Sequence, residues 1–550
     1  MIKTKLERVL NNVQKPARYT GGEYNQIIKD KQNVNVRIAF CFPDTYEIGM
    51  SNLGLKILYG VLNNIDDVWC ERVFAPWTDM EQEMRENDIP LYGLESYDAI
   101  RDFDIIAFTV GYELSYTNVL NMLDLAGIPL RSADRGENDP LVIAGGACCY
   151  NPEPIADFVD LFVVGEGEDV IVELVDIYKS SNGKNDFLKA SFNLDGVYIP
   201  SLRTEESHPI NKRIVKDLDG AYFPVDSIIP STGIVHDRSV LELFRGCIRG
   251  CKFCMAGYTG NPVRARSPEV LTEQGILSIT NSGYDELALL SLSTSDYKHL
   301  NELCDNLLKW CEPRNVNLSL PSLRADNFSI ELMERVQKVR KSGLTFAPEA
   351  GSQRLRDYIN KNITEEDLLG ACKVAFEGGW NSVKLYFMLG LPTETDEDIF
   401  AIAELAHTVH QIWRDHTSNK KRGVRITVST SCFIPKPHTP FQREAQIPID
   451  EYLRRVDLLK TSIRSKAITY NWHSPHQGYI EAALSRGSKE LGNVIEAVWR
   501  KGARMDSWSD HFSFEKWLSA FEECGVDPEH YASRERNSDE ELPWEFIKIK

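Results

Sequence analysis

The segment Phe244-Arg245-Gly246-Cys247-Ile248-Arg249-Gly250-Cys251-Lys252-Phe253-Cys254 carries three cysteines in the spacing C-x3-C-x2-C. Iron–sulfur clusters are usually held by four cysteine thiolates, and this segment, called the cysteine loop below, supplies three. The next cysteines along the chain, Cys304 and Cys311, lie on a predicted helix with a spacing unlike that of zinc sites. The loop is therefore predicted to bind a cluster with one iron open to a small molecule, as catalytic zinc sites keep an open position.

Two other roles for the three cysteines are half of a structural zinc site and buried thiols that act as small hydrophobic side chains. A zinc module of the C-x2-C type needs a second pair of cysteines downstream. A buried core does not carry the two glycines and three cations that surround these thiols. The composition of the loop therefore favours a metal cluster.

The spacing, with Phe253 before the last cysteine, resembles the radical S-adenosylmethionine (SAM) superfamily. The resemblance implies a 4Fe-4S cluster on Cys247, Cys251 and Cys254 whose open iron chelates the amino and carboxylate groups of SAM. An electron from the cluster would split the sulfonium and give a 5′-deoxyadenosyl radical. The chain would then be an enzyme that receives electrons from a low-potential donor such as flavodoxin or ferredoxin.

The composition is that of an ordinary globular protein, with 42% hydrophobic and 26% charged residues. At 550 residues the chain is too long for one hydrophobic core. It has no apolar run of signal-peptide or membrane-span length, and its twelve cysteines are scattered. These features predict a cytoplasmic protein of several domains with reduced thiols.

The net charge of −19 opposes a role in which the whole molecule binds nucleic acid through phosphate contacts. Two stretches are locally basic: residues 238–266, which include the cysteine loop, and Lys420-Lys421-Arg422. The first would attract an anionic electron carrier or substrate, or it is simply a solvated surface.

Short apolar runs alternate with amphipathic segments over residues 35–180, which is typical of a doubly wound parallel α/β sheet. Helices are predicted at 51–64, with Ser51 as the cap, and at 114–125. The predicted strands are 36–42, 68–75, 104–110, 141–146 and 161–165. Ligands bind beyond the carboxyl ends of such strands. The candidate residues at that rim are Asp44, Tyr46, Gly145, Gly146, Gly165 and Glu166.

This region resembles the cobalamin-binding domain that precedes the radical SAM core in one large subfamily, on the match of Gly145-Gly146 and Val164-Gly165-Glu166-Gly167-Glu168. The D-x-H-x-x-G motif of that domain, whose histidine ligates cobalt, is absent. The histidines before the cysteine loop, His208 and His236, lie outside the domain. Either cobalamin binds without a protein ligand below the metal, or the fold carries another ligand or none.

A second alternation of strands and helices follows from residue 236 to residue 470. Helices are predicted at about 267–282, 297–311, 328–340, 364–377, 395–414 and 449–464. The predicted strands are 239–245, 286–293, 316–321, 344–348, 382–389 and 424–433. These strand–helix units make a partial (β/α)6 TIM barrel, two units short of a full barrel. This count suits the partial barrel of radical SAM enzymes.

The sequence therefore predicts five regions in a mixed α/β chain. The last carries five tryptophans and a terminal tail at 540–550. Its aromatic residues would form core rather than a substrate platform. The regions are a leader (1–34), the cobalamin-binding-like domain (35–180), a linker with a small β element (181–235), the barrel (236–470) and a helical extension (471–550).

Polar residues follow the carboxyl ends of the predicted barrel strands, and β/α barrels carry their functional residues at these ends. Carboxylates and hydroxyls suit the ammonium and ribose of SAM, and an arginine suits its carboxylate. Beside the cysteines, the candidate SAM contacts are Phe253, Ser293, Ser295, Asp296, Arg324, Glu349, Ser352, Gly390 and Glu394. The alternative for each is an ordinary cap or turn at the barrel mouth.

The superfamily resemblance assigns unequal roles to these positions. Asp296 would replace the acid of the glycine-glycine-glutamate motif that contacts the SAM amino group, since both glycines and the glutamate are absent here. Glu349 and Ser352 match the end of the fourth strand in methylthiotransferase-like relatives, which implies ribose or amino-group contact. The segment 388–394 and Phe253 would pack against adenine.

Residues 433–441, Phe-Ile-Pro-Lys-Pro-His-Thr-Pro-Phe, resemble the proline-rich end of the sixth strand in methylthiotransferases. They are predicted to shape the substrate entrance, because three prolines make the segment stiff. That family carries an auxiliary cluster on three N-terminal cysteines. The flanking sequences of Cys41, Cys70, Cys148 and Cys149 do not match its pattern, and Cys41 and Cys70, which lie in predicted strands, are predicted to be buried.

Over residues 1–545 the chain resembles a subgroup of radical SAM proteins with an N-terminal cobalamin-binding-like domain. The downstream reaction is then methylation or thiolation of a substrate such as RNA or a ribosomal protein. Two alternatives stay open. One is a non-catalytic cluster- or corrinoid-binding regulator, and the other is an RNA-binding scaffold.

Overall fold

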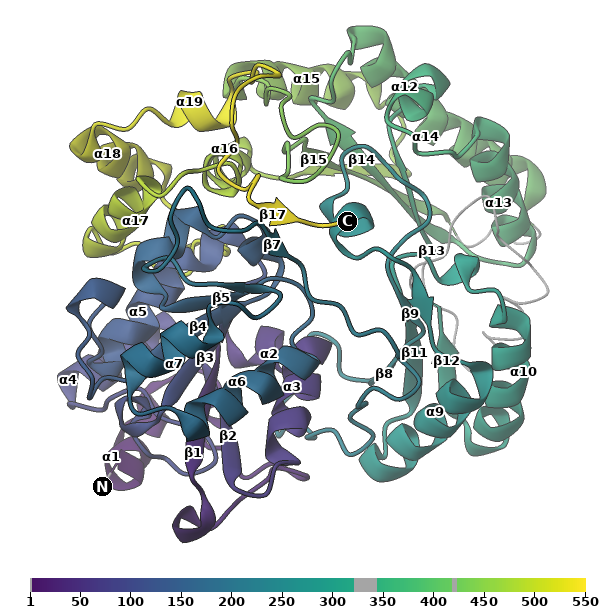
Figure 1. Ribbon diagram of the computed structural model, residues 1–550. Coiled ribbons are helices and arrows are strands. Elements are labelled where there is room, and N and C mark those ends of the chain that lie inside the picture. Colours follow the sequence, from purple (N-terminus) through teal and green to yellow (C-terminus); the bar gives the residue numbers. More distant parts are fainter. Residues whose placement is uncertain (1, 321–343, 418–422) are drawn as a thin grey trace. The chain divides into compact units, whose positions relative to one another are not determined.

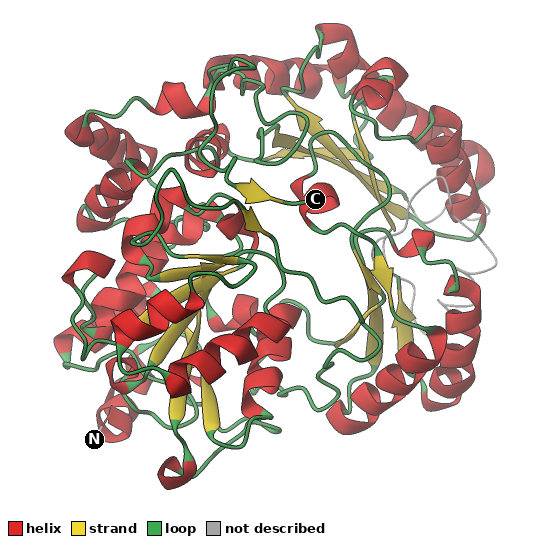
Figure 2. Cartoon of the chain, in the orientation of Figure 1, coloured by secondary structure: helices red, strands yellow, loops and turns green. Residues whose placement is uncertain are grey.

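The computed structural model describes residues 2–320, 344–417 and 423–550 (Figure 1). The chain divides into two compact units. Unit 1 comprises residues 1–237, 483–531 and 541–550, and unit 2 comprises residues 238–482 and 532–540. Each unit is an α/β structure in which helices and strands alternate (Figure 2).

Unit 1 is built on a six-stranded sheet in the order β2-β1-β3-β4-β5-β6. All neighbours are parallel except β6, which is antiparallel to β5. The strands are β1 (Val36–Phe42), β2 (Val68–Phe74), β3 (Ile105–Thr109), β4 (Leu141–Gly145), β5 (Leu161–Val163) and β6 (Val197–Tyr198). The first five agree with the predicted strands, because strands covered on both faces read as continuous apolar runs.

Helices lie on both faces of this sheet (Figure 2). They are α1 (Ile2–Val9), α2 (Tyr46–Gly49), α3 (Leu53–Asn63), α4 (Thr78–Glu86), α5 (Tyr116–Ala126), α6 (Glu168–Ser180) and α7 (Lys184–Ser191). Helix α3 begins at Leu53, and its cap lies one residue later than the predicted Ser51. Its cap is Asn52, whose side chain accepts a hydrogen bond from Leu55 N at 2.9 Å, whereas Ser51 Oγ donates to Glu47 O at 2.7 Å.

The C-terminal region adds α17 (Leu491–Arg500), α18 (Phe514–Cys524) and most of α19 (Pro528–Ala532) to unit 1. Helix α17 packs on α5. The predicted terminal tail is wrong, because β17 (Ile547–Lys548) pairs with β7 (Ile210–Asn211). Trp499, Trp517 and Trp544 are buried, as expected for core aromatic residues, whereas Trp472 and Trp508 are exposed and do not follow that expectation.

A segment of the C-terminal region, Met505–Trp508, covers the carboxyl ends of β1 and β3. Met505 N donates to Asn118 Oδ1 at 2.9 Å, and Asn118 Nδ2 donates to Pro43 O at 2.9 Å. Ser507 Oγ and Trp508 Nε1 both donate to the Asp44 carboxylate, at 3.0 and 2.9 Å. In the order 2-1-3 the gap between β1 and β3 is the topological switch point, where α/β sheets usually bind ligands. The chain's own residues fill it here.

Unit 2 has two parallel sheets, ordered β12-β11-β8 and β13-β14-β15-β16. A short antiparallel pair, β9 (Phe244–Arg245) and β10 (Arg264–Ala265), flanks the cysteine loop. The strands of the sheets are β8 (Ser239–Glu242), β11 (Glu286–Leu290), β12 (Asn317–Ser319), β13 (Leu344–Glu349), β14 (Ser382–Leu389), β15 (Arg425–Cys432) and β16 (Ile468–Trp472).

The six predicted barrel strands are present, and β16 is an addition that the sequence analysis missed. It places Trp472 on a strand rather than in a helical extension. The helices of unit 2 are α8 (Met255–Thr259), α9 (Pro268–Ser282), α10 (Leu300–Cys311), α12 (Gln353–Tyr358), α13 (Glu365–Glu377), α14 (Asp396–His416) and α15 (Ile449–Ser462). Helix α16 (Pro475–Ser485) runs along the chain from unit 2 into unit 1. The predicted helix at 328–340 lies outside the described residues.

Threonine caps explain where two of these helices begin. At α13, Thr364 and Asp367 form a reciprocal capping box, and Thr395 and Asp398 do the same at α14. The mixed α/β fold class with parallel sheets is therefore confirmed. Among the described residues, no helix is both long and apolar enough to cross a membrane.

The buried carboxyl of Asp506 gives a stability prediction. Asp506 is fully buried and accepts a hydrogen bond from Thr117 Oγ1 at 2.9 Å, and burial raises its pKa to about 6. An aspartate in the unfolded chain titrates near 3.9. The native state therefore holds the proton to higher pH, and stability falls as the pH rises from about 4 to about 6.

We expect Asp506→Asn to raise the thermal unfolding midpoint at about pH 7.5, with a gain of up to about 3 kcal/mol that shrinks below about pH 6. Asp510→Asn is the matched control, because Asp510 is exposed in the same segment and should change little at any pH. A variant that unfolds below the wild type at about pH 7.5 but not at about pH 4 would contradict this expectation and show that the charged carboxylate stabilises the fold.

Candidate active site

The cysteine loop begins at the end of β9 and finishes at α8, beyond the carboxyl end of β8. Both of its glycines have left-handed backbones, with φ of +89° at Gly246 and +65° at Gly250. A Cβ on Gly246 would lie 3.0 Å from the carbonyl oxygens of Gly260 and Pro262. Only glycine fits this turn without strain, so the glycines of the motif set the path of the loop between the thiols.

The backbone of the loop is held by residues from other elements. Asn360 Nδ2 donates to Gly250 O at 2.9 Å and to Arg249 O at 3.2 Å. Lys252 N donates to Ile359 O at 3.0 Å, and its own carbonyl accepts from Phe441 N at 3.3 Å. The turn after α12 and the proline-rich segment therefore fix the middle of the loop, so the thiols are presented by a supported backbone.

The three thiols lie in partly enclosed surroundings. Cys251 is buried, and Cys247 and Cys254 are half-buried. Burial raises the pKa of the Cys254 thiol, the nearby Cys247 thiol raises it further, and Lys361 lowers it. In the described residues no three His, Cys, Asp or Glu side chains surround one ion-sized point. A three-cysteine cluster site does not require such a point, because each thiolate binds a different iron of the cluster.

Glu349 lies beside the cysteines at the end of β13 and forms an ion pair with Lys361 at 3.1 Å. Its backbone is left-handed, with φ of +69°, which is rare outside glycine and costs about 1–3 kcal/mol. Burial raises the pKa of the Glu349 carboxyl, and Lys361 opposes that rise. A strained, largely buried acid paired with a lysine next to the thiols is a candidate for cofactor binding.

Asp296 is paired with Arg249 of the cysteine loop, and the Arg249 guanidinium binds both carboxylate oxygens of Asp296. The Nε–Oδ2 distance is 2.8 Å, and the second contact joins Nη2 to Oδ1. The Ser293 hydroxyl is buried without a hydrogen-bond partner in the described part of the chain. Ser295 lies half-buried between them in the turn Thr294–Asp296. An orphaned buried hydroxyl costs about 1–3 kcal/mol, which favours a ligand at Ser293.

Three other predicted contacts are engaged within the protein. Ser352 Oγ caps α12 by accepting from Leu355 N at 3.2 Å, and it donates to Asp398. Glu394 accepts from Gly390 N at 2.7 Å and pairs with Arg455, and burial raises its pKa to about 7. These side chains shape the rim and leave little capacity for SAM.

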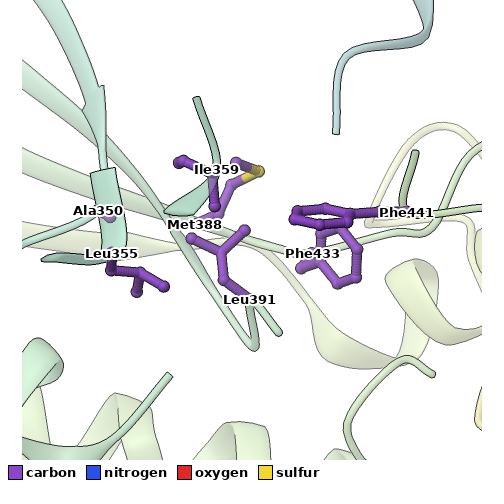
Figure 3. Close-up of a cluster of buried hydrophobic side chains, with 7 residues drawn as sticks. All are labelled: Ala350, Leu355, Ile359, Met388, Leu391, Phe433 and Phe441. Carbon is purple, nitrogen blue, oxygen red and sulfur yellow. The ribbon is translucent and has the colours of Figure 1, made fainter. Parts of the chain in front are cut away.

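A buried apolar cluster lies beside these polar groups, built from residues at or after the ends of three strands, from α12 and from the proline-rich segment (Figure 3). Phe253 and Tyr358 pack partly buried against it. The members of the apolar cluster are Ala350, Leu355, Ile359, Met388, Leu391, Phe433 and Phe441. The cluster is buried, so the apolar side chains that remain partly exposed beside the cysteine loop are Phe253 and Tyr358, and aromatic side chains suit an adenine ring.

The predicted rim of unit 1 is occupied by the chain itself. Asp44 accepts hydrogen bonds from Ser507 and Trp508, and Tyr46 Oη donates to Glu23 Oε1 at 2.9 Å. Glu166 accepts from Val215 N at 2.6 Å. These polar side chains do not point to a ligand, so the residues predicted for a corrinoid do not fit one in this arrangement.

The rim glycines serve turns. A Cβ on Gly146 would meet Val110 O at 2.6 Å, and one on Gly165 would meet Arg213 O at 2.2 Å, whereas Gly145 has only ordinary contacts. The first turn of α6 borders a cavity of about 860 Å³ lined by residues such as Asp169, Arg213 and Tyr222.

Several residues were not foreseen from the sequence. Lys361, Asn360 and Asn261, which accepts from Cys247 N at 3.2 Å, come from turns outside the motif. Asn360 and Asn362 have left-handed backbones, and the run Asn-Lys-Asn was the available signal. Arg324 and the cations 420–422 lie outside the described residues. Cys41 and Cys70 are buried, as predicted, and so are Cys148 and Cys149. Burial raises the thiol pKa of Cys41, Cys70 and Cys149.

Two family models match the chain. Residues 54–200 match the N-terminal region of radical SAM proteins, and residues 241–406 match the radical SAM superfamily. The second match contains the cysteine loop and Glu349. The chain belongs to the radical SAM superfamily. It is therefore an enzyme of that superfamily, which implies a 4Fe-4S cluster and SAM as cofactors.

The relatives agree with this assignment. An uncharacterised protein of Methanocaldococcus jannaschii is 29% identical over 494 residues, which are 89% of this chain and 97% of the relative. A protein of the same organism named as a methylthiotransferase is 24% identical, over 67% of this chain and 74% of its own length.

The solved structure of the radical SAM methyltransferase TsrM from Kitasatospora setae, with cobalamin and a 4Fe-4S cluster bound, shares the fold. Its TM-score is 0.51 at 14% identity, over 74% of this chain and 77% of that one.

The pair between Arg249 and Asp296 predicts how firmly the loop keeps its cluster. We expect Asp296→Asn to speed iron loss from the reconstituted protein to a chelator by about ten-fold, since one partner of a partly buried pair is removed. Glu286→Gln is the matched control, because it breaks the Arg238–Glu286 pair of 2.8 Å away from the loop. Equal rates of iron release in both variants would contradict the anchoring role.

Proposed function

We propose that this enzyme reductively cleaves SAM at a 4Fe-4S cluster bound by Cys247, Cys251 and Cys254. The resulting radical would drive methylation or thiolation of a substrate. The observation that carries the proposal is the supported three-cysteine loop beside the Glu349–Lys361 ion pair. When bound by Cys247, Cys251 and Cys254, the cluster would supply one electron to the sulfonium of SAM, whose C5′–S bond would break to give methionine and the 5′-deoxyadenosyl radical.

The chain's own residues would bind the two ends of SAM. Lys361 is suited to the carboxylate and Glu349 to the ammonium, because the two side chains already form a charge pair that a zwitterion can replace. Ser293 adds an unused hydroxyl for the ribose or amino group. The thiolates, the acid and the lysine thus meet at one end of the strands.

The apolar cluster around Met388 and Phe433 would receive the adenine and exclude water (Figure 3). Phe253 belongs to the cysteine loop and packs against these apolar side chains. The position of the adenine ring is therefore linked to the position of the iron–sulfur cluster. Excluding water from the site protects a reactive intermediate from side reactions. Gly390 and Glu394 keep the turn after β14 in shape, and Asp296 positions the loop.

Cobalamin is a second candidate cofactor, suggested by the fold shared with TsrM, whose solved structure holds cobalamin. In this chain the rim side chains of unit 1 are engaged internally, and Met505–Trp508 fills the switch point. We therefore derive no step of the proposed mechanism through a corrinoid.

The substrate class is carried over from relatives. Several relatives are named as tRNA methylthio-modifying synthases, including one from Hydrogenobaculum at 24% identity over half of this chain, which favours RNA over a ribosomal protein. We propose flavodoxin or ferredoxin as the electron donor, and a cytoplasmic location, where thiols stay reduced.

We expect the anaerobically reconstituted chain to form 5′-deoxyadenosine from SAM when dithionite is added. Cys247→Ala, Cys251→Ala and Cys254→Ala should each reduce the product to the level of a sample without protein, because a cluster site left with two thiolates no longer holds the cluster. Cys524→Ala is the control, since this half-buried cysteine of α18 lies outside the loop. Product is measured by chromatography.

The same experiment separates the alternatives. A non-catalytic regulator would carry a cluster yet give no 5′-deoxyadenosine after reduction. An RNA-binding scaffold would retain RNA in a salt-dependent way without cluster or product. Either result would overturn the proposal.

A further inference from the structure

The four-stranded sheet of unit 2 has one apolar face and one polar face. On β14, Val383, Leu385 and Phe387 are buried, whereas the alternate side chains of Lys384 and Tyr386 are exposed. Helix α14 packs against β14 and β15. Because side chains alternate between the two faces of a strand, the buried set lies under the helices and the exposed set lies on the opposite face. We call that opposite face the open face.

The neighbouring strands extend this pattern. On β15, Ile426 and Val428 are buried while Arg425 is exposed, and on β16 Ile468 is buried while Thr469 and Asn471 are exposed. The strand register places the open-face residues in rows across the sheet. One row is Thr345, Lys384, Thr427 and Thr469, the next is Tyr386, Ser429 and Asn471, and Arg425 stands beside Ser382 in the row before them.

The open face is positively charged. Lys384 and Arg425 are on adjacent strands and one row apart, so their backbones are about 8 Å from each other. Among the described residues, neither has an acidic partner within ion-pair distance. The acids of the other strands are already committed: Glu242 to Arg245, Glu286 to Arg238 and Glu349 to Lys361. Two cations without acids stand out in a chain of net charge −19.

A stabilising role does not account for this face. The interior of a complete β/α barrel is packed with bulky branched side chains, and the hydroxyl, amide and amine groups here add no such packing. A surface that is only solvated usually mixes both signs of charge, as at Arg454, which binds Asp396 and Glu451. Unopposed cations instead attract an anionic ligand.

We propose that the open face binds a phosphorylated ribonucleoside unit of the substrate. Lys384 and Arg425 bind the phosphate, Ser429 and Asn471 bind sugar hydroxyls, and Tyr386 stacks on the base. Lys384 lies four residues before Met388, a member of the apolar cluster, on the same strand. The two residues are therefore about 13 Å apart along β14. The phosphate is thus held deep in the barrel and the reacting end lies near SAM. This inference rests on the proposed function only for the position of SAM.

The test measures binding by titration calorimetry, without SAM, to the full chain carrying its cluster. The probes are adenosine 5′-monophosphate, a short oligoribonucleotide and, as the uncharged comparison, adenosine. We expect at least one phosphorylated probe to bind about ten-fold more tightly than adenosine, which is the worth of a hydrogen bond to a charged group. Binding of the mononucleotide alone identifies a free nucleotide as the source, and binding of the oligonucleotide alone identifies RNA.

Lys384→Gln and Arg425→Gln should each weaken binding of that probe about ten-fold. Lys373→Gln is the matched control, since it removes one exposed lysine from α13 and should leave binding unchanged. Asn471→Ala, which alters no charge, should weaken binding while the salt dependence stays the same. Equal binding of adenosine and the phosphorylated probes, or equal loss in Lys373→Gln and Lys384→Gln, would overturn the inference. Formation of 5′-deoxyadenosine by the unchanged chain reports the proposed function separately.

Discussion

The backbone of the cysteine loop is the constraint on which the site depends. For the proposed cluster, three thiolates from eight residues must approach one another, and a free loop would sample many other shapes, so that ordering it costs about 1–2 kcal/mol per residue. Here the side chain of Asn360 donates hydrogen bonds to the carbonyls of Arg249 and Gly250, and Arg249 forms an ion pair with Asp296. The proline-rich segment donates a backbone hydrogen bond to the carbonyl of Lys252. Side chains and backbone groups from three other segments therefore hold the backbone of the loop.

The same carboxyl edge concentrates unusual backbone conformations. Glu349, Thr393 and His438 follow successive strands and all have left-handed φ values between +61° and +69°. Such residues persist where the surrounding structure fixes them, and they cluster at functional sites. Hydrogen bonds within the rim supply that fixation, as when Glu394 binds Gly390 N. Two of the predicted cofactor contacts, Ser352 and Glu394, are therefore better understood as supports of the rim.

The sequence predicted the strands well for a physical reason: buried parallel strands are continuous apolar runs bounded by glycine, proline and polar residues. Strand β16 was missed because Ile-Thr-Tyr-Asn-Trp has one buried residue at its start and several exposed ones. The cap of α3 was displaced by one residue because Ser51 and Asn52 both suit that position.

The cysteine spacing predicted the proposed cluster site from the sequence alone, since ligand spacing is local. Lys361 and Asn261 could not be predicted, because only the tertiary fold brings their turns to the loop. Met505–Trp508 at the edge of β1 and β3 is a similar case, since it lies more than 300 residues from those strands.

The two faces of the unit 2 sheet divide the work of stability and function. Burying an apolar side chain such as Val428 or Leu385 under α14 stabilises the fold by about 1.5–3 kcal/mol, so that face leaves little freedom in sequence. The side chains of the open face bury little apolar surface, so stability places little constraint on them and they can serve ligand binding. In the proposed arrangement, the carboxyl edge of this sheet binds the cofactor, and the open face, which carries Lys384 and Tyr386, binds the substrate.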